Sequence, residues 1–548
     1  MPSIAQSDFV NAVSKARDES PETNALVIPV SIRVLADQLT PVLAYRRLVS
    51  RDQRTAPSFL LESVEGGDQQ GRYSLLAAHP MMEVVAHANK TTVTDHRHGE
   101  STSNTTTEPD PLDKLRTISA DWKQVIPQET ADRGVLPSCV LGGWFGYAGY
   151  DSVRYAEPTK LSFDDAPEDD RHLPELAFGF YDELVIFDHV DKVIHLVKLV
   201  FVEPADDPSA QYIGAMSALD QLAEQVQEHS KPLPLGRVAS TRPSTNSPMP
   251  CNTTREQHAA MIERAKEYIN QGDIFQVVLG HRFERRANAD PFDVYRALRA
   301  VNPSPYMVYM QTAGCILVAS SPEILCRVRK DESAAGKLTV TNRPLAGTRR
   351  RGKTPEDDQA MEADLLADPK EISEHSMLVD LGRNDVGMVA EPGTIELSKL
   401  MSIERYSHVM HISSTVTGTI RQGLDCWDAL RAALPVGTIS GAPKIRAMQI
   451  IDELEKVRRG PYGGGLGWVS LDQEMDIALT LRTIVVPLDR FDEHEAQGHW
   501  AYHIQAAGGI VADSVPELEF KETVNKAAAL GAAIDLAISA FDQDTHDE

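Results

Sequence analysis

A loop rich in glycine and hydroxyl groups, followed at once by an amphipathic helix, constrains the fold of this chain more than any other feature. The segment LPVGTISGAPKIRAMQIIDELE (434–455) places this loop between Gly437 and Gly441, with the predicted helix after it. Glycine permits a tight turn, and the first N–H groups of a helix have no partner within it, so the loop could bind a small anion. An ordinary helix start with Pro443 in its first turn is the alternative. The segment alone supports both interpretations.

The chain carries an excess of acidic side chains. Of its 548 residues, 80 are Asp or Glu and 54 are Lys or Arg, which gives a formal net charge of −26. Such a charge opposes binding to a phosphate backbone, so we expect no nucleic-acid partner. It does not exclude binding of a small anion, because arginine side chains and backbone N–H groups act locally.

The cysteine pattern and the hydropathy of the sequence indicate the cellular compartment. The five cysteines are scattered, without a CxxC pair or a zinc-binding spacing, which favours a reducing compartment. The first residues lack a long apolar stretch, and no window elsewhere approaches the roughly 20 apolar residues that span a bilayer. We therefore expect a cytoplasmic protein without a membrane partner.

A segment rich in proline and serine divides the chain, and we interpret it as a linker (231–250). Before it, apolar runs such as ALVIPVSI alternate with polar loops, which predicts a β-rich domain with some helices over residues 1–230. Residues 251–540 form the second predicted domain. There TREQHAAMIERAKEYINQGD has the spacing of a helix that ends near Gly272, and IFQVVLGHRFE that of the next strand. The last residues, DQDTHDE, form an acidic tail.

Two pairs of glutamates share one spacing. Glu371 and Glu374 lie three residues apart in one helix-like segment, and Glu519 and Glu522 in another, so each pair occupies one helix face. Glutamate is usually solvated, and a surface position is the ordinary explanation for a single pair. If the two helices face each other, a cation must neutralise the charges. Mg²⁺ fits, since it binds one or two carboxylates together with waters and substrate oxygens.

Three other polar residues stand in apolar surroundings. Arg482 lies in DIALTLRTIVV, a predicted strand, where an unpaired guanidinium would be costly, so it pairs either with an acid such as Asp476 or with a bound anion. Glu323 in SSPE and His411 in VMHIS are acid–base candidates. A single histidine on an apolar strand is more often a core residue with satisfied hydrogen bonds than a catalyst.

Four further motifs accompany the loop and helix described first. They are RPLAGTRRRG (343–352), DPKEISEHSMLVDLGRND (368–385), VMHISSTVTG (409–418) and DSVPELEFKET (513–523). Together the five motifs resemble those of the chorismate-utilising enzymes, over roughly residues 254–530. The resemblance implies an α+β fold of packed β-sheets flanked by helices, with a smaller N-terminal regulatory region.

The resemblance also implies roles for the glutamate pairs. In that family the second glutamate of each pair binds Mg²⁺ and the first lies close by. Glu374 and Glu522 would therefore be the metal ligands, with Glu371 and Glu519 beside them as catalytic candidates. The metal would hold the ring carboxylate of chorismate.

The remainder of chorismate would be bound by residues of the other motifs. By resemblance, Arg482 forms two parallel hydrogen bonds with the enolpyruvyl carboxylate. The other implied substrate contacts are Gly347, Thr348, Thr438, Tyr462, Gly508 and Gly509. Glu323 would protonate the departing C4 hydroxyl, and His411 matches a position that the family needs for turnover.

Two positions separate the branches of the family. Relatives that activate water carry a lysine where this chain has Gln276, and aminodeoxychorismate synthases of the common type carry a nucleophilic lysine where it has Ala346. With neither lysine present, the resemblance implies attack by ammonia at C2, as in the branch that forms anthranilate and pyruvate. Two alternatives stay open: an aminodeoxychorismate synthase without the lysine, and a non-catalytic subunit that senses tryptophan.

Ammonia needs a source outside this chain. Class I glutaminases resemble one another in a Gly-x-Cys-x-Gly motif at the nucleophile, and none of the five cysteines here is so placed. We therefore expect a separate glutamine amidotransferase subunit as a partner, with free ammonium able to replace glutamine in part.

Two motifs resemble the tryptophan feedback site of the anthranilate-forming branch, namely FLLESVEGG (59–67) and NPSPYMVYM (302–310). The inhibitor contacts that they imply are Glu62, Ser63, Pro305, Tyr306 and Met307. Apolar walls suit an indole, and a carboxylate with hydroxyls suits its amino-acid end. The alternative is a structural seam between two halves of the chain. Both interpretations are compatible, because a ligand at a seam can bias domain closure.

Overall fold

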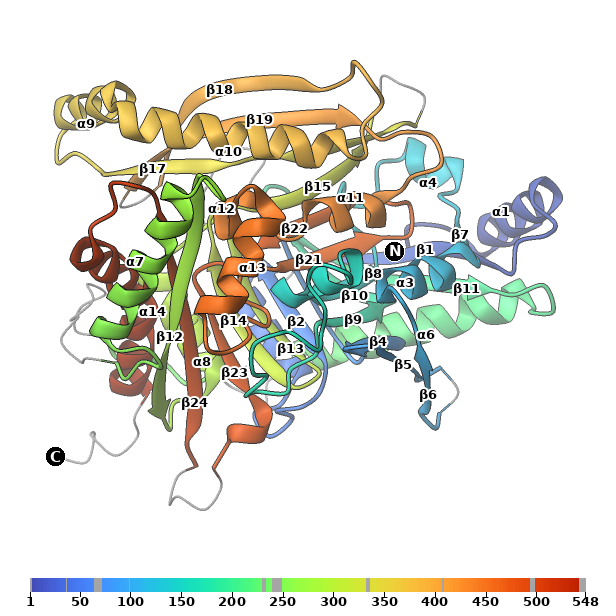
Figure 1. Ribbon diagram of the computed structural model, residues 1–548. Helices are drawn as coiled ribbons and strands as arrows, with labels where there is room; N and C mark the ends of the chain where they lie inside the picture. The colour runs from blue at the N-terminus through green and yellow to red at the C-terminus, as the bar shows by residue number, and fades with distance from the viewer. Residues whose placement is uncertain are drawn as a thin grey trace, which may run out of the picture.

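The computed structural model shows two large β-sheets with helices around them (Figure 1). The residues that it describes are 2–35, 37–63, 71–97, 99–228, 233–238, 249–331, 336–406, 409–492 and 498–541. The predicted acidic tail (542–548) and most of the predicted linker lie outside these residues. The predicted α+β fold of packed sheets flanked by helices is confirmed.

Within the described residues the first sheet has 12 strands. Their order is β20 (Gly441–Ala442), β12 (Gln276–Ala287), β24 (Trp500–Ile510), β23 (Thr483–Pro487), β14 (Cys315–Ser321), β13 (Tyr306–Thr312), β2 (Ser58–Glu62), β3 (Tyr73–Ala78), β10 (Glu183–Asp188), β11 (Val193–Val202), β1 (Ala25–Val34) and β7 (Trp122–Gln124). All neighbours are antiparallel except β1 and β7, which are parallel.

The second sheet also has 12 strands in the part of the chain that the structure describes. Its order is β17 (Leu345–Arg350), β19 (Val409–Thr419), β16 (Leu338–Asn342), β15 (Ile324–Lys330), β22 (Met475–Leu479), β21 (Gly465–Ser470), β8 (Gly143–Ala148), β9 (Leu176–Tyr181), β4 (Met82–His87), β5 (Lys90–Asp95) and β6 (Thr102–Thr107), and β18 (Glu396–Arg405) pairs with β19.

Both sheets contain strands from both sides of residues 231–250. In the first sheet β2 pairs with β13, and in the second β8 pairs with β21. The two predicted parts of the chain therefore share their sheets, because strands of one part are hydrogen-bonded to strands of the other. The division into a regulatory and a catalytic domain stays a prediction about function.

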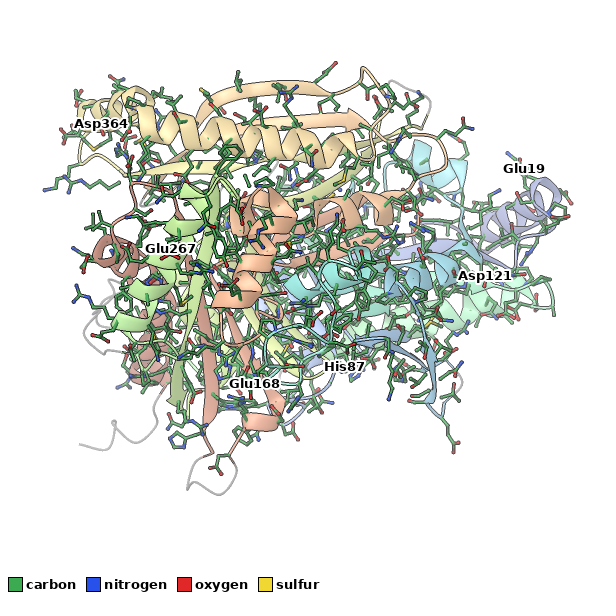
Figure 2. All side chains as sticks on the ribbon, viewed as in Figure 1. Glu19, His87, Asp121, Glu168, Glu267 and Asp364 are labelled. Atoms are coloured by element: carbon green, nitrogen blue, oxygen red, sulfur yellow. The ribbon has the colours of Figure 1, made fainter. Side chains whose placement is uncertain are left out.

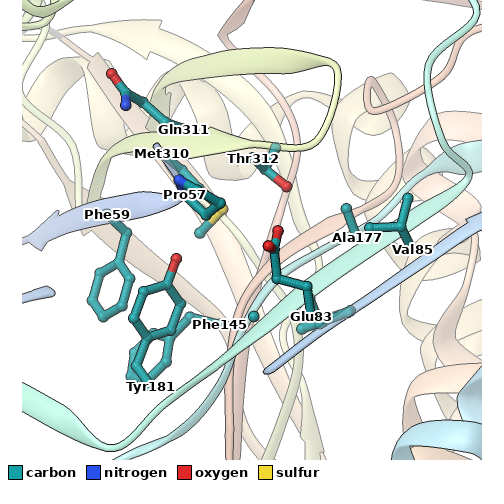
Figure 3. Close-up of a pocket in the computed structure, with 12 residues that line it drawn as sticks. Pro57, Phe59, Glu83, Val85, Phe145, Ala177, Tyr181, Met310, Gln311 and Thr312 are labelled. Atoms are coloured by element: carbon teal, nitrogen blue, oxygen red, sulfur yellow. The ribbon is translucent and has the colours of Figure 1, made fainter. Parts of the chain in front are cut away.

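The largest hydrophobic core lies between the two sheets. Phe59 of β2 and Phe145 of β8 come from different sheets and stack with ring centroids 4.0 Å apart, and Tyr181 of β9 packs edge-on against Phe59 at 4.9 Å. A cavity of about 10 Å³ beside these rings is lined also by Glu83 and Gln311 (Figure 3). That volume is about one water molecule, so this interior position cannot hold an organic ligand.

Helices cover the outer faces of the sheets. Those before residue 231 are α1 (Gln6–Glu19), α2 (Pro41–Leu48), α3 (Pro111–Ala120), α4 (Gln128–Asp132), α5 (Val153–Ala156) and α6 (Pro208–Gln227), and those after it are α7 (Arg255–Asn270), α8 (Pro291–Val301), α9 (Pro355–Ala367), α10 (Pro369–Gly387), α11 (Cys426–Ala433), α12 (Gly437–Ser440), α13 (Lys444–Leu454) and α14 (Pro516–Phe541), with 3₁₀ turns at Tyr150–Ser152 and Leu488–Arg490. Figure 1 shows α10 in one layer with β17, β18 and β19, and α10 packs on β17 and β19.

The C-terminal helix corrects one expectation. Among the described residues, α14 is the one helix long and apolar enough to cross a membrane by length and composition, with 26 residues and a mean hydropathy of 1.3 in its most apolar window. The expectation that no window approaches such a length was wrong here. In the structure α14 packs against α8, α7 and β24, with Leu530 and Ile534 buried. This packing accounts for the apolar side chains that are buried, and 39% of the apolar window is buried.

Local sequence signals specify several elements correctly. The helix predicted to end near Gly272 is α7, which begins after Thr254 in a reciprocal hydrogen-bonded cap, and the strand predicted after it is β12. The helix predicted after Gly441 is α13. The loop before it differs from the prediction, because residues 437–440 form the short helix α12 and the next two pair with β12 as β20. Pairing with β12 fixes this segment more tightly than a free loop.

The acidic excess of the sequence is found largely at the surface. Glu267 on α7 and Asp364 on α9 are exposed, and both lie at the periphery of the ribbon (Figure 2). Acidic groups that are buried instead, such as Glu323 and Glu519, are therefore exceptions that need a physical explanation.

Candidate active site

The chain crosses from one sheet to the other twice at the same place. β14 of the first sheet is followed by β15 of the second, with only Pro322 and Glu323 between them. β22 of the second sheet is followed by β23 of the first, with only residues 480–482 between them. Glu323 and Arg482 therefore both lie where the two sheets separate.

Hydrogen bonds hold the two crossings against each other. Leu479 N donates to Glu323 O at 2.9 Å, and Ser320 N donates to Arg482 O at 3.1 Å. Ser321 Oγ donates to Leu479 O at 2.5 Å. The side chains of Glu323 and Arg482 thus start from adjacent backbone, and the positive charge of Arg482 lowers the pKa of Glu323.

The predicted strand through Arg482 is wrong, because the chain breaks there to change sheets. Arg482 has φ of 46°, in the left-handed region that residues with side chains seldom adopt. The flanking strands are both buried, so the apolar pattern continues across the break and conceals it. The alternative partner, Asp476, binds Arg327 at 3.0 Å and Arg329 at 2.8 Å.

Glu323 is buried and holds its proton at neutral pH. Burial raises the pKa of Glu323 to about 8, although the backbone of Leu345, the Thr438 side chain and the Arg482 charge lower it, and Glu404 raises it further. Thr438 Oγ1 lies 3.5 Å from Oε1 of Glu323, at the edge of hydrogen-bonding distance. A protonated carboxyl in a closed site is suited to donate a proton to a leaving group.

His411 on β19 is neutral at physiological pH, since burial lowers its pKa to about 4. Its Nδ1 lies 2.8 Å from Gly347 O and 3.1 Å from Thr348 Oγ1. Because a carbonyl oxygen only accepts, Nδ1 carries the proton, which leaves Nε2 as an acceptor. His411 therefore has the protonation state of a base or a hydrogen-bond acceptor. Its hydrogen bonds also hold Gly347 and Thr348 of the PLAGT motif beside it.

The two glutamate pairs face each other across the site. Burial raises the pKa of Glu374 on α10, and the charges of Glu371 and Glu522 raise it further. Burial likewise raises the pKa of Glu519 on α14, with Glu522 adding to the effect. The predicted meeting of the two helices is thus present in the structure. Such charges repel unless a cation intervenes.

Basic side chains already bind one member of each pair. Arg349 Nη1 lies 3.2 Å from Oε1 of Glu371, and Lys526 Nζ lies 2.7 Å from Oε1 of Glu522. Among the residues described, no three His, Cys, Asp or Glu side chains form a group that could hold a metal. A metal at this place would therefore need waters and substrate oxygens besides two carboxylates, as Mg²⁺ does.

Glycines keep the space beside these carboxylates open. A Cβ added at Gly508 would lie 3.2 Å from Oε2 of Glu519, and one at Gly347 would lie 3.2 Å from Oε2 of Glu371. A Cβ at Gly509 would overlap the amide nitrogen of Gln276 and lie 3.8 Å from Oε1 of Glu374. The bare backbone of these glycines is what allows close approach to the carboxylates.

Tyr462 forms another wall of the site. Its ring is 3% exposed, and burial raises the pKa of its hydroxyl, which hydrogen-bonds with the backbone of Ala507 beside Gly508. Gly463 and Gly464 follow and form backbone hydrogen bonds of 3.0 and 2.8 Å with Thr480 in the second sheet crossing. These backbone hydrogen bonds connect the segment of Tyr462 to the crossing that contains Arg482.

Two buried polar atoms belong to residues that the sequence did not single out for substrate binding. Within the described residues, Oγ1 of Thr480 and Oε1 of Gln276 have no hydrogen-bond partner, and both side chains are at most 3% exposed. A buried polar group without a partner costs about 1–3 kcal/mol, which a bound ligand can recover. The sequence signal for Thr480 was weak: a single hydroxyl in an apolar run, two residues before Arg482.

The residues of the predicted inhibitor site also lie together. β2 pairs with β13 so that Glu62 is opposite Met307. Glu62 accepts a hydrogen bond of 2.6 Å from Tyr295 and pairs with Arg299 at 2.8 Å. The neighbouring Ser63 has a buried hydroxyl without a partner among the residues described. Residues 64–67 of the first motif lie outside the described part of the chain.

The second motif is linked to the sheet crossing. Pro305 is buried at the start of β13, and the Tyr306 hydroxyl donates to Oδ1 of Asp476 at 2.9 Å. Arg327 donates to the same hydroxyl at 2.9 Å. Asp476 lies on β22, which leads into the crossing with Arg482, and Arg327 lies on β15, which follows Glu323.

Comparison with known proteins decides the family. The model of the chorismate binding enzyme family matches residues 56–532. The chain belongs to this family. It is an enzyme that acts on chorismate, and the site described above is the one on which the family motifs converge.

Three relatives illustrate how far the similarity extends. Anthranilate synthase alpha subunit 1, chloroplastic, of Oryza sativa subsp. indica is 51% identical over 529 residues, covering 94% of this chain and 89% of the relative. Anthranilate synthase component 1 of Acetivibrio thermocellus is 41% identical over 512 residues, covering 93% and 96%. The crystal structure of anthranilate synthase component I from Streptococcus pneumoniae TIGR4 has a TM-score of 0.66 and 32% identity, covering 91% and 99%.

The buried state of Glu323 predicts a pH dependence. The protonated form is the acid, so kcat for chorismate should be constant below the pKa of about 8 and fall as the pH rises through it. Glu323→Gln should lower kcat at least about 100-fold and remove this limb. The measurement is kcat against pH from 6 to about 9.5 for both proteins. A wild-type rate that stays level through this range would contradict the assignment.

Proposed function

We propose that this chain is the large, chorismate-binding subunit of an anthranilate synthase, which converts chorismate and ammonia to anthranilate and pyruvate in tryptophan biosynthesis. The observation that carries the proposal is the meeting of Glu323 and Arg482 at the double sheet crossing. The names of the three relatives support the same activity.

Each residue of the site has its own role in substrate binding or proton transfer. The guanidinium of Arg482 pairs with the enolpyruvyl carboxylate, and the backbone at Gly508 and Gly509 approaches the same end of the substrate. Glu323, protonated at neutral pH, donates to the departing C4 hydroxyl as ammonia adds at C2. Loss of pyruvate and of a ring proton then gives the aromatic product. His411, with Nε2 free to accept, is suited to orient or receive a proton in that later stage.

The glutamates fit a Mg²⁺ ion. Burial and neighbouring negative charge raise the pKa values of Glu374 and Glu519, and a hard cation relieves such repulsion. Glu374 and Glu522 would hold the ion, with Glu371 and Glu519 beside them. When bound, Mg²⁺ supplies positive charge for the ring carboxylate of chorismate.

Ammonia is the nucleophile that the site favours. Gln276, at the position of the water-activating lysine of other branches, is neutral and 3% exposed. Ala346 lies on β17 opposite Ile412, next to Gly347, and offers no amine. Without a basic or nucleophilic lysine at either position, supplied ammonia must attack C2.

We infer that a separate glutamine amidotransferase subunit delivers this ammonia. The relatives are named as alpha subunits and as component 1, and none of the five cysteines lies in a Gly-x-Cys-x-Gly motif. We also place the enzyme in the cytoplasm. All five cysteines are free, as is usual in a reducing compartment.

The reaction product tests the proposed function. Purified chain with chorismate, Mg²⁺ and ammonium should form anthranilate and pyruvate in equal amounts. Anthranilate fluorescence and mass spectrometry measure the products. The omission of ammonium should abolish the product, because the chain has no nucleophile of its own. Accumulation of 4-amino-4-deoxychorismate or isochorismate as the main species would reject the proposal. So would tight chorismate binding without turnover, which is the outcome expected of a sensing subunit.

The metal assignment predicts the effect of neutral substitutions. Glu374→Gln and Glu522→Gln should each lower Mg²⁺-dependent kcat at least about 100-fold and weaken Mg²⁺ binding, because an amide replaces a hard anionic ligand. Isothermal calorimetry with Mg²⁺ gives the binding directly. Glu517→Gln, an exposed change in the first turn of α14, is the matched control and should behave as wild type. Normal rates in both test variants at saturating Mg²⁺ would refute the site.

Tryptophan is the proposed feedback inhibitor, bound beside the paired strands β2 and β13. The unpartnered Ser63 hydroxyl and the Glu62 carboxylate supply polar groups for its amino-acid end, and Pro305 and Met307 supply apolar walls. Tyr306 lies between Pro305 and Met307 in the sequence, and its hydroxyl donates to Asp476.

Ser63→Arg should fill and charge this pocket. We expect the tryptophan concentration for half inhibition, relative to each protein's own uninhibited rate, to rise at least about tenfold, because the cation takes the space of the ligand. Ser7→Arg on the exposed face of α1 is the control. Calorimetry with tryptophan checks binding separately from inhibition. If wild-type protein neither binds nor responds to tryptophan, the regulatory proposal fails.

A further inference from the structure

A buried arginine lies behind the candidate site. After α13 the chain turns toward Tyr462, and Arg459 in this turn is 2% exposed. Burial lowers the pKa of an arginine, and the charge of Glu455 more than offsets this, so the pKa of Arg459 remains above its ordinary value. A permanently charged group in this place is tolerated only with strong partners.

The first partner is a carboxylate in the same turn. Arg459 Nε donates to Oε2 of Glu455 at 2.9 Å, and Nη2 donates to Oε1 at 2.5 Å, which is the two-bond geometry of arginine with a carboxylate. Oε1 of Glu455 also accepts from the backbone of Gly280 on β12 at 2.9 Å. The guanidinium lies over the ring of Tyr150, 4.6 Å from its centroid. The pair is thus fixed on several sides.

The remaining donors of Arg459 reach two separate segments of the site. Nη1 donates to the carbonyl of Ile439 at 2.7 Å, and Nη2 donates to the carbonyl of Val278 at 2.7 Å. Ile439 lies in α12 and Val278 lies in β12, far apart in the sequence. One side chain therefore fixes the distance between these two pieces of backbone.

Each of these carbonyls is next to a residue of the site. Ile439 follows Thr438, whose hydroxyl is 3.5 Å from Glu323, and Val278 is two residues after Gln276 on the same strand. Residues two apart on a strand point to the same face. The charge of Arg459 also lies close enough to Tyr462 to lower the pKa of its hydroxyl.

We propose that Arg459, held by Glu455, is a positioning residue for the reaction, which sets Thr438 against Glu323 and holds the strand that carries Gln276. The inference rests on the proposed function and extends it to residues outside the substrate pocket. Arg459 does not touch the substrate and acts through Thr438 and β12.

Arg459→Lys is the test, because lysine keeps the charge but cannot reach Glu455, Ile439 and Val278 with one nitrogen. In the reaction with ammonium, kcat should fall about 10–100-fold with KM for chorismate changed less than about threefold, since positioning rather than binding is lost. Thr438 lowers the pKa of Glu323, so its displacement should move the alkaline limb of kcat upward. The other groups that act on Glu323, namely Leu345, Arg482 and Glu404, are unchanged.

Two comparisons separate positioning from a general loss of packing. Arg47→Lys is the matched control: Arg47 on α2 is also buried, at 8% exposed, and donates to Val226 O at 2.6 Å, and it has no contact with Ile439 or Val278 among those described. It should keep the kcat, KM and pH profile of wild type within about twofold. Thr438→Val should produce the same upward shift, and adding Arg459→Lys to it should produce no further shift.

The outcomes distinguish this inference from the function on which it rests. If wild-type protein forms no anthranilate, the proposed function fails. If wild type is active and folded Arg459→Lys keeps its kcat and alkaline limb, or if Arg47→Lys shows the same changes, the positioning role is overturned. If Arg459→Lys does not fold, Glu455→Gln, which weakens the hold on Arg459, decides by the same two readouts.

Discussion

The double crossing between the sheets is the constraint on which the site depends. The backbone bonds between Leu479 and Glu323 and between Ser320 and Arg482 fix two reversals of direction side by side. Glu323 and Arg482 both lie in these connections, each between a strand of one sheet and a strand of the other. The carboxyl and the guanidinium therefore start from neighbouring backbone because the chain changes sheets there twice.

The same geometry sets the electrostatics. The crossing is buried, and burial is the main reason that Glu323 keeps its proton and His411 lacks one at neutral pH. On the other side, α10 and α14 bring glutamates together near Gly508 and Gly509, so negative charge accumulates where a cation and an anionic substrate can meet. The neutral Glu323 and the glutamates of α10 and α14 thus differ in electrostatic environment, because each group has its own surroundings.

Sequence patterns specified the local elements and the chemistry but not the connections between sheets. α7, β12 and α13 followed from caps and periodicity, and the family motifs named the residues that meet in the site. The break at Arg482 was missed, since buried strands on either side of a crossing give one continuous apolar run. The sharing of both sheets by the two parts of the chain depends on pairings such as β2 with β13, which no local pattern encodes. Thr480 was missed because an unpartnered hydroxyl is visible only once its neighbours are known.

A crystal structure with chorismate and Mg²⁺, grown without ammonia, would show whether the double crossing builds the active site. The ring should lie between Glu323 and the glutamates, with Arg482 in two hydrogen bonds to one carboxylate and the metal on Glu374 and Glu522 beside the other. The C4 hydroxyl should lie within about 3.2 Å of the Glu323 carboxyl. Chorismate bound elsewhere, or bound here with Glu323 and Arg482 both out of reach, would contradict the claim that the double crossing builds the active site.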